Sequence, residues 1–161
     1  GAMTDHVHLR LVLQQEGPYA FRIDFAGTDL AALHSDEPPP LGEGRGPNPS
    51  ALLLASIANC LSASLLFALR KYRNEPGPLR TEIVATPTRN SDGRLRIPRA
   101  YVTLQLAEGN EHYTQLERIL TQFENYCTVT QSVRDGIEVE VTVKDAHGRT
   151  LLGDKSYEAG A

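Results

Sequence analysis

The first 25 residues of the chain contain two runs in which apolar and polar side chains alternate. One run covers residues 7–13, the other covers residues 19–25, and Glu16-Gly17-Pro18 separates them. A period of two places successive apolar side chains on one face of a half-buried strand. The pattern therefore predicts a β-hairpin, and a shorter third strand is expected over residues 30–35.

A loop and then a long helix are predicted next. Residues 38–46 are rich in proline and glycine, which favours a loop. Asn48 is a favoured N-cap, and Pro49 suits the first helical position because its missing N–H would have no partner there. The uncharged apolar run over residues 50–69 ends in basic residues and in Pro76-Gly77-Pro78. The expected helix has about 25 residues and a length of roughly 37 Å.

The same run is long enough to cross a membrane. Polar side chains nevertheless interrupt it, and polar groups at the centre of a bilayer are costly. A span would also place two β-rich halves of the chain on opposite sides of the membrane. We therefore expect no membrane partner, and instead a helix that is buried on every face. The polar residues of the run are Ser50, Ser56, Asn59, Ser62 and Ser64.

The second half of the chain predicts further strands and helices. Strands are expected over residues 81–86 and 101–106, with a turn at Asp92-Gly93 between them. An amphipathic helical stretch over residues 116–126 follows, then a short helical turn over residues 130–134. The clearest alternation, over residues 137–144, predicts a strand, and a last short strand is expected near residues 150–152. The order βββ-α-ββ-α-β(β) indicates an α+β fold, since strands and helices do not alternate regularly.

Composition narrows the functional class. Gly1-Ala2-Met3 is typical of a cloning scar, and we expect residues 4–161 to form a single domain. The net charge of −4 does not favour nucleic acid as a partner. The hydrophobic fraction of 40% is slightly lean, which favours a core completed by a second copy of the chain. Two cysteines without a secretory signal fit a reducing cytoplasm.

The two cysteines are the main candidates for chemistry. Cys60 lies deep in the apolar helix, and Cys127 closes the amphipathic stretch. Each is by itself more readily explained as a small buried hydrophobic residue. Two thiols on core-seeking faces are, however, able to meet in a compact fold and form a redox pair. Cys60 lies about three turns into its helix, too far for the helix dipole to activate it, so a reactive Cys60 requires a nearby cation.

Arg45 is the main candidate for that cation, because it lies in the loop immediately before the helix. Arg22 is a weaker candidate, and acidic residues such as Glu43 are available to orient a guanidinium. The spacing of His, Cys and acidic residues predicts no metal site, and no glycine-rich phosphate loop follows a strand. We therefore expect no cofactor.

Two motifs resemble the OsmC/Ohr family. The first is Gly46-Pro47-Asn48-Pro49 followed by Cys60 in an alanine- and leucine-rich helix. The second is Tyr126-Cys127-Thr128-Val129-Thr130 ahead of a short helix and a valine-rich strand. The resemblance implies an intertwined homodimer with the long central helices buried between sheets. It also implies a thiol peroxidase that reduces organic hydroperoxides in oxidative-stress defence.

The resemblance assigns roles to individual residues. Cys60 would be the peroxidatic thiolate, and Cys127 the resolving thiol that forms a disulfide with it. A dithiol or a reductase would then restore the thiols. We expect Ser50, Leu53 and Ile57 to contact the substrate, since an apolar helix wall suits an organic hydroperoxide better than hydrogen peroxide.

The chain departs from the peroxidase branches of that family. Those branches carry glutamate where this chain has Ser50 or Ala51, and they usually carry proline where it has Thr128. These features resemble a less-characterised OsmC-like branch. The alternative function is therefore a non-catalytic or weakly catalytic protein that binds a small molecule or senses redox state.

Overall fold

The structure is a computed structural model that describes residues 8–153. The chain divides into two compact units, one ending at Leu53 and the other beginning at Leu54.

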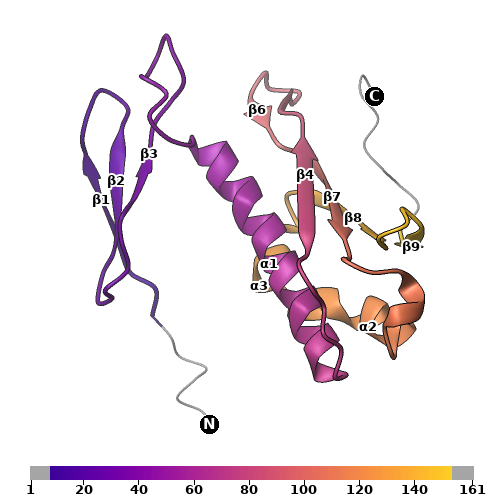
Figure 1. The fold of residues 1–161 in the computed structure, drawn as a ribbon. Coiled ribbons are helices and arrows are strands. Elements are labelled where there is room, and N and C mark those ends of the chain that lie inside the picture. Colours follow the sequence, from indigo (N-terminus) through magenta and orange to yellow (C-terminus); the bar gives the residue numbers. More distant parts are fainter. Residues whose placement is uncertain (1–7, 154–161) are drawn as a thin grey trace. The chain divides into compact units, whose positions relative to one another are not determined.

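The first unit contains a three-stranded antiparallel sheet in the order β1-β2-β3 (Figure 1). Its strands are β1 (Leu11–Gln15), β2 (Phe21–Phe25) and β3 (Leu33–Ser35). The predicted hairpin and third strand are confirmed, although Val7 lies outside the described residues. The expectation of a half-buried first strand is wrong for this chain alone, because all five residues of β1 are exposed.

Helix α1 (Pro49–Lys71) starts and ends where the capping residues predict. The Ala51 N–H donates to Asn48 Oδ1 over 2.9 Å, which confirms the N-cap. At the other end Arg73 adopts a left-handed conformation with φ of 63°, and the Asn74 N–H donates to the Leu69 carbonyl over 3.0 Å. This is the hydrogen-bond pattern that commonly closes a helix, usually with glycine in the position of Arg73.

Only one face of α1 is buried, so the expectation of burial on every face is wrong for the single chain. Phe67, on the other side, is 59% exposed. Within the described residues α1 is the one helix long and apolar enough to cross a membrane, a property that core helices of soluble proteins share. Its buried residues are Ile57, Leu61, Ser64, Leu65, Ala68 and Leu69.

The second unit is built on a four-stranded sheet in the order β4-β7-β8-β9. Strands β4 (Arg80–Ala85) and β7 (Arg99–Gln105) are antiparallel, as are β8 (Glu138–Lys144) and β9 (Thr150–Leu152). The central pair β7 and β8 is parallel, with Val102 opposite Val141. All four were expected from the sequence, with boundaries that differ by at most two residues.

A small hairpin occupies the position where only a turn was predicted. Strand β5 (Thr88–Arg89) pairs with β6 (Leu95–Arg96). Asn90 closes the turn, because its side-chain oxygen accepts from the N–H groups of both Asp92 and Arg94 over 3.0 Å. Two-residue strands are too short for a pattern of period two to reveal them.

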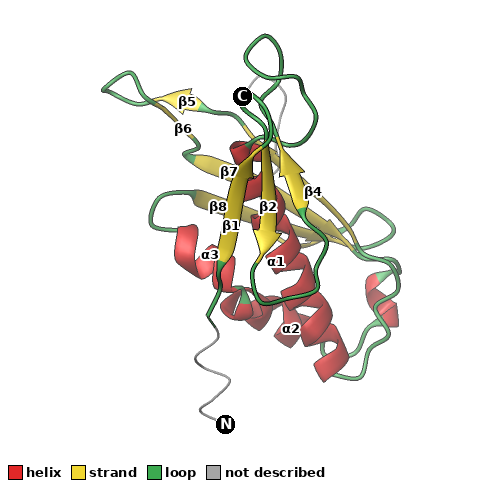
Figure 2. Cartoon of the chain, turned by 90° about the vertical axis from the view of Figure 1, so that its left-hand side faces the viewer, coloured by secondary structure: helices red, strands yellow, loops and turns green. Residues whose placement is uncertain are grey.

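Short helical segments connect the parallel strands β7 and β8 (Figure 2). They are η2 (Asn110–His112), α2 (Leu116–Gln122), η3 (Phe123–Tyr126) and α3 (Thr128–Val133). The amphipathic stretch over residues 116–126 is thus one α-helix followed by a 3₁₀ turn. The short helix predicted over residues 130–134 begins two residues earlier than expected.

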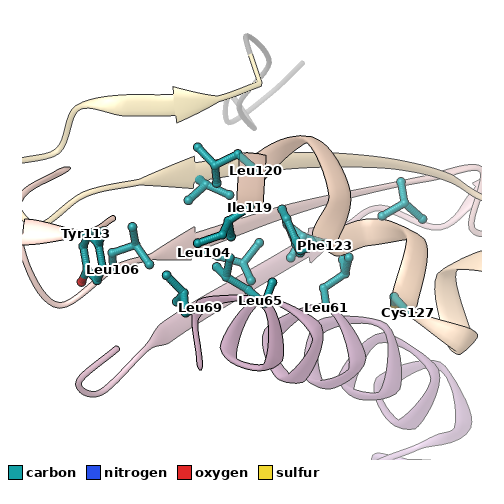
Figure 3. Close-up of a cluster of buried hydrophobic side chains, with 14 of the residues drawn as sticks. Leu61, Leu65, Leu69, Leu104, Leu106, Tyr113, Ile119, Leu120, Phe123 and Cys127 are labelled. Atoms are coloured by element: carbon teal, nitrogen blue, oxygen red, sulfur yellow. The ribbon is translucent and has the colours of Figure 1, made fainter. Parts of the chain in front are cut away.

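The core of the second unit lies where α1 and the connecting helices pack on the sheet. Leu104 of β7 points into it beside Leu65 of α1 and Phe123 of η3 (Figure 3). Val102, two residues earlier on the same strand, is buried in the same cluster. Cys127 is a member of the same buried cluster. The amphipathic pattern therefore brings the end of η3 against the long helix.

Candidate thiol site

Cys60 and Cys127 meet in the second unit. Cys60 is half-buried on α1, and Cys127 is fully buried at the end of η3. Their side chains lie close enough to influence each other's ionisation, and both cysteines are free thiols. The core-seeking faces identified in the sequence therefore do bring the two sulfurs together, as a redox pair requires.

The backbone around Cys127 fixes the direction of its thiol. Cys127 is not the last residue of the amphipathic helix, as the sequence suggested, but the N-cap of α3. Its extended backbone (φ −88°, ψ 95°) allows Sγ to accept from the Thr130 N–H over 3.4 Å. Its own N–H donates to the Glu124 carbonyl over 3.1 Å. The Cys127 thiol is thus held at a turn between two helical segments.

The surroundings of Cys127 keep its sulfur protonated at neutral pH. Burial raises the pKa of the Cys127 thiol, and the neighbouring Cys60 thiol raises it further. The Thr130 hydroxyl and N–H act in the opposite direction without reversing the shift. A protonated, fully buried thiol is a poor first nucleophile. Of the pair, the more accessible Cys60 is the better placed to attack a substrate.

Arg45 and Ser50 belong to the first unit and Cys60 to the second, so their action on Cys60 stays a prediction. The Arg45 side chain is 69% exposed, and its Nη2 donates to Glu43 Oε2 over 2.8 Å. Arg22, the weaker candidate, pairs with Asp24 over 3.0 Å. An acidic residue of the loop thus orients the Arg45 guanidinium, although glutamate is absent at position 50.

The residues expected to contact the substrate differ in exposure. Ser50 and Leu53 are exposed and lie in the first unit. Ile57 is fully buried in the core cluster of the second unit. Their contact with a substrate stays a prediction. Among the described residues no group of three or more His, Cys, Asp or Glu side chains is placed to hold a metal ion.

Asp36 organises the loop that carries Arg45, a role that the sequence did not reveal. Its buried carboxylate accepts from the N–H groups of Glu37 (2.7 Å), Glu43 (3.2 Å) and Arg45 (3.2 Å). The loop is also tight at Gly46, where a Cβ would lie 2.3 Å from the His34 carbonyl oxygen. Aspartate among turn residues was the available signal, since its side chain commonly caps local N–H groups.

This carboxylate makes the loop sensitive to acid. Burial alone would raise the pKa of Asp36, but the three N–H groups lower it below its usual value. The ionised Asp36 carboxylate therefore stabilises the loop fully at pH values above the usual carboxyl pKa. This stabilisation is lost as the pH falls through the lowered pKa of Asp36. The amide NMR shifts of Glu43 and Arg45 should titrate together at that lowered pH. An Asp36→Asn variant should lack the titration, and shifts that move at or above the usual carboxyl range would contradict this account.

Comparison with known proteins places the chain in a family. Residues 42–142 match the profile of the OsmC-like proteins. Comparison with curated proteins found no match. An OsmC-like protein from Mycoplasma pneumoniae has a similar fold, with a TM-score of 0.71 and 12% identity over 88% of this chain and 99% of that one.

Two further solved structures are described as organic hydroperoxide resistance proteins. OhrB of Bacillus subtilis gives a TM-score of 0.64 and 16% identity, over 86% of this chain and 98% of its own. The protein from Elizabethkingia anophelis gives a TM-score of 0.67 and 15% identity, over 87% of this chain and 97% of its own. At these identities the similarity shows the shared α+β fold with its long helix, and the profile match shows the family. This chain belongs to the OsmC-like protein family.

Proposed function

We propose that the protein is a thiol-dependent peroxidase that reduces organic hydroperoxides in a reducing cytoplasm. The observation that carries the proposal is the pairing of two free thiols, Cys60 on α1 and the buried Cys127 beside it. One member is partly accessible on an apolar helix, and the other is buried and protonated. The family membership supports the same conclusion, since some OsmC/Ohr proteins are thiol peroxidases.

The first step needs only Cys60 and the substrate. The Cys60 thiolate attacks the terminal oxygen of the hydroperoxide, a sulfur–oxygen bond forms, and the oxygen–oxygen bond breaks. The substrate leaves as an alcohol after taking up a proton, and Cys60 becomes a sulfenic acid. Two electrons have moved from the sulfur to the peroxide.

The second step uses the pairing with Cys127. The Cys127 sulfur attacks the sulfenic sulfur, a disulfide forms, and the sulfenic oxygen leaves as water with the proton from Cys127. A low-molecular-weight dithiol or a reductase then returns both sulfurs to thiols by exchange. One peroxide is thus reduced for each dithiol that is oxidised.

A turnover assay tests this proposal. Reduced protein at catalytic concentration, with dithiothreitol in excess and cumene hydroperoxide as substrate, should consume many equivalents of peroxide, and hydrogen peroxide should react more slowly. Consumption that stops after one equivalent favours the redox-sensing alternative, to which the missing glutamate at position 50 points. Consumption no faster than dithiothreitol alone contradicts a peroxidase.

We propose that Arg45 activates Cys60 by favouring its thiolate form. Arg45→Ala should slow the oxidation of Cys60, because a cation is needed where the helix dipole is too distant. Ser50→Glu should speed it by adding a bidentate partner for the guanidinium, and a negative charge in the first turn suits the helix. Rates of Cys60 alkylation as a function of pH measure both effects. An Arg45→Ala profile that coincides with that of the parent chain would show a loop charge without function.

We also propose a homodimer, because the single chain leaves much apolar surface uncovered. Leu11, Leu13 and Leu33 of the first unit are each about half exposed, at 49%, 53% and 50%. Phe67 of α1 is exposed as well. Apolar patches of this kind commonly mark protein interfaces. Sedimentation equilibrium at micromolar concentration should give twice the monomer mass, and a stable folded monomer would contradict the proposal.

A further inference from the structure

Thr130 makes two hydrogen bonds to the buried Cys127, one to its sulfur and one to its backbone carbonyl. Its N–H donates to Cys127 Sγ over 3.4 Å, and its hydroxyl donates to the Cys127 carbonyl over 3.1 Å. Both Thr130 and Cys127 are 0% exposed. The hydroxyl also acts on the sulfur, where it lowers the pKa of Cys127 against the larger effects of burial and of Cys60.

We propose that Thr130 is the positioning residue of the disulfide-forming step: it holds Cys127 Sγ against Cys60, and its hydroxyl stabilises the negative charge that develops on Sγ as Cys127 attacks. The inference rests on the proposed function for its biological meaning. The contacts on which it is based involve only Cys60, Cys127 and Thr130, and all three residues lie in the second unit.

The second step requires such a donor. The Cys127 thiol must lose its proton to attack, yet burial opposes a thiolate at this position. Helix α1 contributes Cys60 as the titratable group that faces it, and Cys60 disfavours the thiolate as well. The largest influences on the pKa of Cys127 come from burial, Cys60 and Thr130, and none of these is a charged side chain. The stabilising donors are the hydroxyl and N–H of Thr130.

The hydroxyl is able to serve the sulfur in both states. While Cys127 is protonated, the hydroxyl proton is donated to the Cys127 carbonyl. As charge develops on Sγ, a rotation about the Thr130 side-chain bond turns the same proton toward the sulfur, because a hydrogen bond to a charged acceptor is the stronger one. The N–H remains on Sγ throughout.

Ser132 provides a matched control on the same helix. Its hydroxyl donates to the Thr128 carbonyl over 2.7 Å, and its side chain is exposed. It therefore makes the same kind of contact to the backbone of α3 without facing a thiol. Removing the Ser132 hydroxyl tests whether any disturbance of α3 is enough to slow the attack of Cys127 on Cys60.

The experiment isolates the second step with a mixed disulfide. Glutathione disulfide converts Cys60 into a mixed disulfide with glutathione. Cys127 then attacks the Cys60 sulfur, the sulfur–sulfur bond to glutathione breaks, and glutathione leaves as a thiolate. Rapid acid quenching and mass spectrometry follow this resolution from pH 6 to pH 10. A parallel series starts from cumene hydroperoxide and follows the sulfenic acid of Cys60.

Thr130→Val keeps the shape and the N–H but removes the hydroxyl. At neutral pH it should slow resolution about tenfold, with the pH profile moved upward by about one unit. Formation of the Cys60 intermediate should change by less than about twofold. Thr130→Ser, which restores the hydroxyl, and Ser132→Ala should both resolve at rates near that of the parent chain.

Three results would overturn the proposal. They are a Thr130→Val profile that coincides with the parent profile, a Thr130→Ser variant as slow as Thr130→Val, and equal slowing by Ser132→Ala. The two reagents separate this inference from the proposed function. A Thr130 effect on the glutathione mixed disulfide, together with no reaction of the parent chain with cumene hydroperoxide, would support Thr130 and reject the peroxidase.

Discussion

Replacing Cys60 with serine should abolish the reaction of the protein with organic hydroperoxide. The alkoxide of serine forms far less readily than a thiolate, and Cys127 cannot substitute because its buried sulfur remains protonated. The second-order rate of peroxide consumption, measured by stopped flow, should fall to that of buffer. A Cys60→Ser variant that still consumes peroxide would show that Cys127 or another group is the nucleophile.

Cys127→Ser separates the two steps and serves as the control. This variant should still consume the first equivalent of peroxide at nearly the parent rate, because Cys60 is retained. Without a partner thiol, the sulfenic acid cannot form the internal disulfide and should be oxidised further to sulfinic acid. Mass spectrometry should therefore find Cys60 heavier by two oxygen atoms. An intact Cys60 thiol after treatment would contradict the assigned order.

The Phe123→Ala variant should show the largest loss of stability. Phe123 is 0% exposed and packs in the core cluster with Leu61 and Leu65 of α1. Removing a buried phenyl ring typically costs about 3–5 kcal/mol in the free energy of unfolding, through lost burial and the cavity left behind. Chemical denaturation at fixed protein concentration measures this. Since η3 leads directly into Cys127, the variant should also slow disulfide formation.

Tyr126→Ala is the matched control for that prediction. Tyr126 lies on the same turn of η3 but is 50% exposed, with its ring 5.8 Å from the ring of Phe67. Loss of this exposed contact should cost about 1 kcal/mol or less. Equal losses for the two variants would mean that Phe123 does not anchor the core.

The sequence predicts those elements whose determinants are local. Asn48 and Pro49 define the start of α1, because the cap is a contact between residues three positions apart. The alternation over residues 137–144 predicts β8, since one face of that strand is buried. The meeting of Cys60 with Cys127 could also be anticipated, because each thiol lies on a face that must be buried.

Features that depend on distant parts of the chain were not predictable in this way. The sequence places Cys127 at the end of a helix, whereas that stretch is divided into α2 and η3 and Cys127 is the N-cap of α3. The parallel pairing of β7 and β8 has no local signature, because it depends on how residues 106–137 cross between them. Whether a face of α1 is exposed likewise depends on the residues that pack against it, and not on the composition of the helix itself.

The central claim is that peroxide oxidation joins Cys60 to Cys127, and peptide mapping after one equivalent of cumene hydroperoxide tests it most directly. The account predicts a single linked pair of peptides containing these two cysteines, a protein lighter by two hydrogen atoms, and the loss of both free thiols with one alcohol released. Two thiols that remain free, or a Cys60 sulfinic acid beside an intact Cys127 thiol, would contradict it.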